Sequence, residues 1–194
     1  VGGQFKPYDI SGQDIAWVRS DGLVIGNQNC GNITVDGIVA AANDNILNVV
    51  TFLANRDGTH VQFRGAASTF NRLDIMADNG IRFNTDLNTD LSHLYLNGDM
   101  DDVADFHNQI AFADGTTAKS VTVLTLEVTT SNIHHLGSAT FKAGTGIWVH
   151  NDVLGTPPHR EVLLHRCAHQ FGGRRGAHDA NIARIFINPA CGLA

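Results

Sequence analysis

Short stretches of alternating apolar and polar residues run through the middle of the chain. Leu73 and Ile75 flank one polar residue, and Ile81 and Phe83 flank another, while Asp-Asn-Gly, Arg-Asp-Gly and Asn-Gly-Asp sequences separate such stretches. A period of two residues is typical of strands with one face in the core, and these separators form turns. We therefore predict many short strands, whose inward positions form the core: Leu73, Ile75, Ile81, Phe83, Leu94, Leu96, Val123, Phe141, Ile147 and Val149.

One pattern occurs twice in the chain without a gap. The segments 75–87 and 141–153 both read apolar-x-Ala-x-x-Gly-Ile-x-apolar-x-x-Asp-apolar. Their offset is about 66 residues, which divides into three units of about 22 residues. One unit cannot bury its apolar face alone, whereas units stacked about 4.8 Å apart can. This predicts an all-β fold, a parallel β-helix (solenoid) of about five to six turns.

In this solenoid we expect Ala77 and Ala143 to point inward at tight corners, and Gly80 and Gly146 to lie in turns. An antiparallel β-sandwich is the alternative, because its strands also recur at short intervals with turns between them. A sandwich does not account for the repeat, so the solenoid is the favoured prediction.

Three regions follow from this pattern. We expect an N-terminal arm with the first strands and a cap over 1–32, the solenoid body over 33–155 and a basic cap over 156–194. Within the last region, apolar residues at helical spacing predict an amphipathic capping helix over 158–171. Alternating apolar residues then predict one more strand within 181–188.

The repeat style resembles the turns of filamentous-haemagglutinin-type secreted adhesins. The sequences "ITVDG", "LDIMADNGIRFNTDL" and "ATFKAGTGIWVHNDV" carry this resemblance, which extends over about 33–153. It implies a right-handed parallel β-helix and an adhesive role. No functional residue can be transferred, because the resemblance is one of repeat style. Those adhesins are very long, whereas this chain has room for only a few turns, which favours a compact module or one unit of a larger assembly.

Charge is unevenly distributed along the chain. Residues 1–155 carry a net charge of −9 and residues 156–194 carry +3. The acidic body argues against nucleic-acid binding, which needs a basic surface. No stretch of about 18 apolar residues is present, so we expect no membrane span. The opposite charges favour head-to-tail contact between copies of the chain, with Arg174 and Arg175 in or near the contact and an arm at 2–14 reaching the neighbour.

The sequence also bears on compartment and redox state. The chain begins at Val1 and has only three lysines, which favours an extracellular or cell-surface protein whose signal peptide has been removed. Cys30, Cys167 and Cys191 allow one intramolecular disulfide in three ways, or three free thiols. The odd cysteine is a candidate for linking two copies covalently.

Two clusters are candidates for metal ligation. Asp99, Asp101, Asp102 and Asp105 form the densest acidic run, and oxygen-rich stretches bind hard cations such as calcium. An acidic surface loop is the simpler interpretation, because the spacing is neither that of a helix–loop–helix calcium loop nor that of the glycine-rich nonapeptide repeats that bind calcium. The second cluster is His159, His165, Cys167 and His169. On a helix His165 and His169 would share a face, but the segment lacks the glutamate of the HExxH motif, which favours surface histidines beside a buried thiol.

Carbohydrate-active chemistry is the main enzymatic alternative. Asp86, Asp101 and Asp102 are candidates for the paired carboxylates of a glycosidase, if stacked turns bring them together. The chain lacks the Gly-His-Gly and Arg-x-Lys segments of β-helix pectin hydrolases, and no nucleotide or nucleophile motif is present. We therefore expect a non-enzymatic extracellular structural protein without a cofactor, either a filament subunit or an adhesin-like module. The alternative is a β-helix that binds or cleaves polysaccharide.

Overall fold

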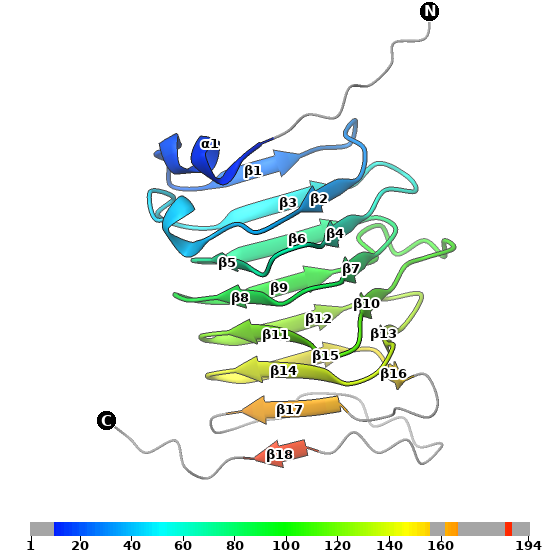
Figure 1. Ribbon diagram of the computed structural model, residues 1–194. Coiled ribbons are helices and arrows are strands. Elements are labelled where there is room, and N and C mark those ends of the chain that lie inside the picture. The colour runs from blue at the N-terminus through cyan, green and yellow to red at the C-terminus, as the bar shows by residue number, and fades with distance from the viewer. Residues whose placement is uncertain (1–9, 156–161, 167–184, 188–194) are drawn as a thin grey trace, which may run out of the picture.

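The chain folds into a stack of parallel turns, seen in a computed structural model that describes residues 10–155, 162–166 and 185–187. Three six-stranded sheets form its sides (Figure 1). The first sheet contains β1 (Leu23–Gly26), β3 (Val50–Ala54), β6 (Leu73–Ala77), β9 (Leu94–Asn97), β12 (Val123–Glu127) and β15 (Gly146–His150). The second contains β2 (Ile33–Val35), β4 (Val61–Phe63), β7 (Ile81–Phe83), β10 (Ile110–Phe112), β13 (Ile133–His135) and β16 (Val153–Gly155). The third contains β5 (Ser68–Phe70), β8 (Leu87–Thr89), β11 (Thr116–Ser120), β14 (Ala139–Ala143), β17 (Val162–Arg166) and β18 (Ile185–Ile187).

Each complete turn contributes one strand to each sheet, and neighbouring strands pair in parallel. In β6, for example, Leu73, Ile75 and Ala77 are buried while Asp74 and Met76 point outward. The strand keeps this alternation in register with β3 before it and β9 after it. The predicted all-β parallel solenoid of about six turns is thereby confirmed. None of the helices in the described ranges has the length and apolarity that a membrane crossing requires.

The turns are less regular than the sequence repeat predicts. Successive turns place Leu23, Val50, Leu73, Leu94, Leu124 and Ile147 at equivalent positions of the first sheet, and the steps between these residues differ in length. The shortest step runs from Leu73 to Leu94, and the longest runs from Leu94 to Leu124. A fixed unit therefore does not describe the chain, although every turn crosses the same three sheets.

The division of the offset between the two motif copies into three units of about 22 residues is wrong, since Ala77 ends β6 in the first sheet and Ala143 ends β14 in the third. Both alanines are buried before a corner, as expected. The shared motif therefore marks how the chain turns a corner, and it occurs at two different corners.

The core is a continuous column of apolar side chains inside the three sheets. Rings from successive turns stack along the axis: Phe63 on Phe83 at a centroid distance of 5.2 Å, Phe83 on Phe112 at 4.7 Å, and Phe112 edge-on to Phe141 at 4.9 Å. Stacked rings of this kind add to the free energy gained by burial. The predicted core positions that are buried are Leu73, Ile75, Ile81, Phe83, Leu94, Leu96, Phe141 and Ile147.

Predictions for β12 and β15 are partly wrong. Val123 is not in the core; the next residue, Leu124, is buried instead, together with Leu126. A shift of one residue moves a whole strand to the opposite face, and the sequence alternates ambiguously here. Gly146 lies within β15, paired with Val123, and not in a turn. Val149 is only partly buried and packs against the core.

Gly80 lies in a turn as predicted, between β6 and β7. Its φ of +96° favours glycine, and a Cβ atom there would lie 2.3 Å from the carbonyl oxygen of His107 in the next turn. A side chain would therefore separate two stacked turns.

The N-terminal end of the stack is covered by helix α1 (Gly12–Trp17), with the 3-10 helix η1 (Ala40–Ala42) beside it. Ser11 caps α1 through a reciprocal capping box with Asp14. Ile15 of α1 is only 3% exposed and belongs to the core. The arm expected over 2–14 is therefore helical from Gly12 onward, while residues 1–9 lie outside the described residues.

The C-terminal side differs from its prediction. Val162–Arg166, expected within a capping helix over 158–171, forms strand β17 and pairs with β14. The helical interpretation is wrong for these residues, because pairing with the open edge of β14 outweighs the local helical spacing. The other residues of 158–171 lie outside the described part. Of the strand predicted within 181–188, Ile185–Ile187 is confirmed as β18, which pairs with β17.

Candidate functional site

The acidic run lies in the loop 98–109 between β9 and β10, but its first member has a structural role. Asp99 is completely buried. Its carboxylate accepts hydrogen bonds from Nδ2 of Asn108 (2.9 Å), the backbone N–H of Thr129 (3.1 Å), and the N–H and Oγ1 (2.7 Å) of Thr130. These donors occupy the carboxylate and connect the loop to the following turn.

Asp105 instead lies beside two aspartates that were not candidates from the sequence. Asp57, Asp78 and Asp105 come from the same corner of three successive turns, and one carboxylate oxygen of each lies within 4.8 Å of the others. We call this set the acidic trio. The stacking of turns brings these residues together, and their separation in the sequence gives no signal of it.

Asp78 is the buried member of the acidic trio, at 3% exposure, and it accepts a hydrogen bond of 2.7 Å from the N–H of Gly58. Burial raises the pKa of the Asp78 carboxyl; the hydrogen bond from Gly58 opposes this, and the charges of Asp101, Asp105 and Asp57 raise it further. Carboxylate oxygens suit calcium, but acidic side chains also gather on surfaces without an ion. Calcium binding therefore remains a prediction.

The carboxylates considered for sugar hydrolysis lie at different corners. Asp86, before β8, accepts a hydrogen bond of 2.8 Å from the N–H of Thr117 in the next turn. Asp101 and Asp102 lie in the loop between β9 and β10, where Asp101 accepts a bond of 3.0 Å from the N–H of Val103. The stacking of turns does not bring Asp86 together with the other two.

Two further aspartates resemble Asp86 in their role. Asp36 accepts a hydrogen bond of 3.0 Å from the N–H of Ala66, and Asp114 accepts one of 2.7 Å from the N–H of Ser138. All three aspartates lie at the corner between the second and third sheets, and each binds the backbone of a later turn. Aspartates at this corner therefore hold the stack together.

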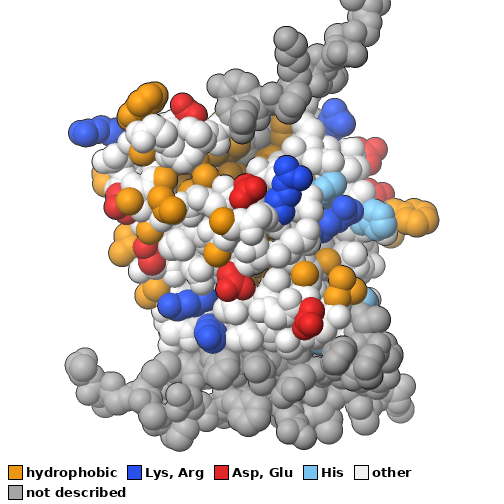
Figure 2. Space-filling view, in the orientation of Figure 1, with side chains coloured by type: hydrophobic (Ala, Val, Ile, Leu, Met, Phe, Trp, Pro, Cys, Tyr) orange, Lys and Arg blue, Asp and Glu red, His pale blue; other side chains and the backbone are white. Residues whose placement is uncertain are grey.

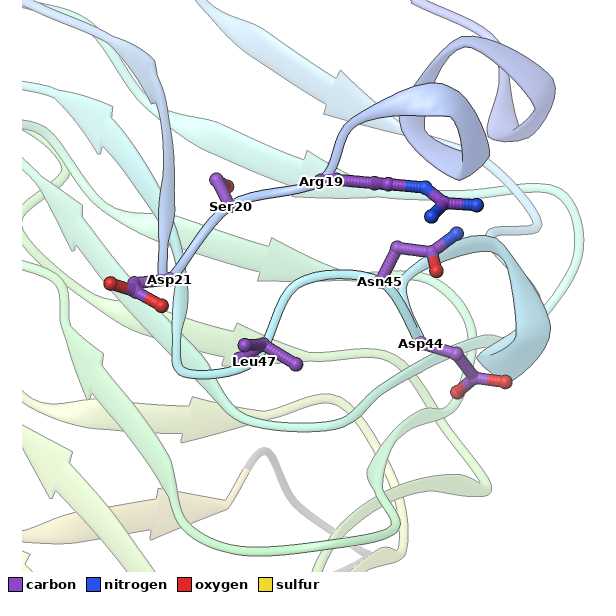
Figure 3. A pocket seen from close by; sticks show the side chains of 6 residues that line it. All are labelled: Arg19, Ser20, Asp21, Asp44, Asn45 and Leu47. Carbon is purple, nitrogen blue, oxygen red and sulfur yellow. The ribbon is translucent and has the colours of Figure 1, made fainter.

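A shallow pocket lies near the N-terminal end, lined by Arg19, Ser20, Asp21, Asp44, Asn45 and Leu47 (Figure 3). The carboxylates of Asp21 and Asp44 lie at opposite ends of the pocket and point away from each other. The amide of Asn45 donates a bond of 2.9 Å to the carbonyl of Ala16 and so supports α1. This arrangement does not provide a pair of carboxylates for acid–base chemistry.

Of the candidate cysteines and histidines, only some lie within the described chain. Among the described residues Cys30 is a free thiol, and its Sγ donates to the carbonyl of Leu53 at 3.3 Å. His165 is in strand β17, so the shared helical face expected for His165 and His169 is not formed. The remaining candidates lie outside the described residues: Cys167, Cys191, Arg174, Arg175, His159 and His169.

The outer surface of the first sheet carries an ordered group of polar and aromatic residues that were not candidates from the sequence. Strand register places Asp74, Tyr95, Thr125 and Trp148 in one column across β6, β9, β12 and β15. The neighbouring outward column contains Asn97, Glu127 and His150. The sequence does contain a signal for these residues. They alternate with the buried residues of the same strands, so the pattern that identifies the core also identifies the side chains that point outward.

Hydrogen bonds order this surface. The hydroxyl of Tyr95 donates to Oε2 of Glu127 at 2.6 Å, and Nε2 of His93 lies 3.0 Å from Oδ1 of Asp74. Burial, and then the bond to Glu127, raise the pKa of Tyr95 to about 12. The hydroxyl therefore stays protonated and continues to donate at neutral pH. We call the side chains of Asp74, His93, Tyr95, Glu127, Trp148 and His150 the aromatic face.

Other exposed groups are more dispersed. Phe106, at 94% exposure, and Val103 project from the loop 98–109. On the surface seen in Figure 2, acidic and basic side chains alternate with hydrophobic ones and do not form one strongly charged patch. Comparison of the chain with protein-family models, curated proteins and solved structures finds no match.

Proposed function

We propose that this chain is a non-enzymatic, adhesin-like β-solenoid module that binds polysaccharide at a cell surface. The observation that carries the proposal is the aromatic face, in which partly exposed aromatic rings and hydrogen-bonded polar groups lie on a ladder of parallel strands. Such a ladder suits an extended polymer, because successive units of the polymer meet successive strands about 4.8 Å apart.

The carboxylates favour binding over hydrolysis. Asp99 and Asp86, two of the aspartates singled out from the sequence, hold backbone N–H groups of neighbouring turns. A glycosidase needs one carboxyl group as acid and another facing it across the sugar. Side chains already used to join the turns are poorly suited to that role.

An adhesive module also agrees better with the N-terminal end of the stack than a filament subunit does. Helix α1 covers the N-terminal end and buries Ile15 there, so this end offers a neighbour less open core than head-to-tail assembly would use. The resemblance to secreted adhesins in the repeats supports the same proposal.

The proposal is tested by incubating the purified full chain with insoluble cellulose, chitin and mannan and measuring the protein that sediments with each. We expect retention on at least one polysaccharide without release of reducing ends, and a monomer in sedimentation velocity. Failure to bind any of them overturns polysaccharide recognition. Release of reducing ends identifies an enzyme instead, and concentration-dependent growth into large particles identifies a filament subunit.

A further inference from the structure

The ring column of the aromatic face runs across the strands, along the axis of the solenoid. Tyr95 on β9 and Trp148 on β15 occupy the same outward column, with Thr125 on β12 between them. Two strand steps separate the backbones of these two residues by about 9–10 Å. Thr125 has a smaller side chain than either aromatic residue, and an extended chain that lies across both rings would pass over it.

The rings are held in place before any ligand arrives. The bond from Tyr95 to Glu127 fixes one ring, and Nδ2 of Asn97 lies 3.4 Å from the same hydroxyl. The indole of Trp148 lies nearly parallel to the imidazole of His150, with centroids 6.3 Å apart and an interplanar angle of 21°. Side chains that are already ordered lose less conformational entropy on binding.

The chemistry of the face selects the class of ligand. Aromatic rings pack on the C–H faces of pyranose sugars, which are widest where the hydroxyls are equatorial, as in β-linked glucose and N-acetylglucosamine. The carboxylates of Asp74 and Glu127 accept hydrogen bonds from hydroxyl groups. Among described residues 10–155 acidic groups outnumber lysine and arginine, so an anionic glycan would be repelled.

We propose that the aromatic face binds neutral β-linked hexopyranose chains, with Trp148 and Tyr95 as two stacking platforms along the solenoid axis. This inference rests on the proposed function and adds to it the site and the ligand class. Glu127 acts as a positioning residue for Tyr95 and as an acceptor for sugar hydroxyls.

The chain supplies its own reporter, because it contains only two tryptophans, Trp17 and Trp148. Trp17 lies on α1 at the N-terminal end, is 73% exposed and is not part of the aromatic face. In the Trp17→Phe variant Trp148 is the sole tryptophan, and titration with cellohexaose or chitohexaose should shift its emission to shorter wavelength. In the Trp148→Phe variant, Trp17 should show no shift with either sugar.

Affinity measurements complete the test. Trp148→Ala should weaken binding of the same hexasaccharides about tenfold or more, because a stacking ring is lost. Tyr95→Phe should weaken it less, since the ring remains. Trp17→Ala should bind like the wild type, and unchanged thermal unfolding midpoints show that each variant is folded.

The outcomes separate the two proposals. If the wild type binds cellulose or chitin but the emission of Trp148 does not respond and Trp148→Ala binds normally, the site is wrong while the function stands. If polygalacturonate or chitosan oligomers bind better than the neutral hexasaccharides, the ligand class is wrong. If no polysaccharide binds, the proposed function itself fails.

Discussion

The carboxylate of Asp99 and the amide of Asn108 are both completely buried and meet at 2.9 Å, which closes the base of the loop 98–109. The same carboxylate accepts bonds from Thr129 and Thr130 of the following turn. One side chain therefore fixes a loop to its own turn and to the next.

We predict that Asp99→Ala lowers the free energy of unfolding by about 3 kcal/mol, because buried donors lose their acceptor. Urea unfolding of the variant measures this loss. Asp90→Ala is the matched control, since Asp90 is exposed. Equal losses in the two variants would show that the buried network adds nothing to stability.

A second prediction concerns the core. Ile81 is completely buried in β7, next to the outward-facing Arg82. Ile81→Ala should cost about 2–5 kcal/mol through lost burial and the cavity it leaves, whereas Arg82→Ala should cost under about 1 kcal/mol. Guanidinium titrations of both variants compare them directly. A loss below about 1 kcal/mol for Ile81→Ala would contradict its place in the core.

Two glycines with similar backbone conformations provide a third test. Gly80 (φ +96°) and Gly58 (φ +75°) both favour glycine, but a Cβ at Gly58 meets no atom within 4 Å, whereas one at Gly80 meets the carbonyl of His107 at 2.3 Å. Gly58→Ala should cost about 1 kcal/mol of conformational strain. Gly80→Ala should cost at least about 2 kcal/mol more, because two turns must separate. Thermal unfolding of the pair measures the difference, and equal midpoints would contradict the close approach of the turns at Gly80.

A fourth prediction concerns pH. The folded state raises the pKa of Asp78 above its ordinary 3.8, chiefly by burial. The folded state favours the protonated carboxyl of Asp78. Its contribution to the free energy of unfolding is therefore fully present below pH 3.8 and is lost as pH rises through the folded-state pKa. Asp78→Asn keeps an oxygen that accepts from Gly58 but has no charge, so it should gain stability relative to the wild type between pH 3.8 and neutrality. Unfolding curves at several pH values with EDTA present test this. A difference that stays constant over that range contradicts it.

The sequence was sufficient for the fold because strands and corners leave local signals. Alternation identified Ile81 and Phe83 as inward residues, and Gly80 identified a turn. The sequence was insufficient to decide which residues of β12 face the core, since a one-residue ambiguity placed Val123 inside in place of Leu124. The unequal lengths of successive turns also defeat any fixed period.

Sites were harder to predict than the fold, because the residues of a site come from different turns. The acidic trio and the aromatic face each combine residues from successive turns, at separations set by the length of every loop between them. Asp105 was selected for its acidic neighbours, but its partners Asp57 and Asp78 lie elsewhere in the sequence. The apolar residues around Leu164 have the spacing of a helix. Pairing of this segment with β14 outweighs that local preference and makes it a strand.

The step from Leu94 to Leu124 is much longer than the step from Leu73 to Leu94, yet the strands on both sides keep their register. Nearly all of the additional residues are accommodated in the loop 98–109, at the corner between the first and second sheets. A fold of this kind can therefore diversify by insertion, since a corner can lengthen without a compensating change in the sheets. The same corner is a natural place to graft a foreign peptide, which the stack would hold out at a fixed height along its axis.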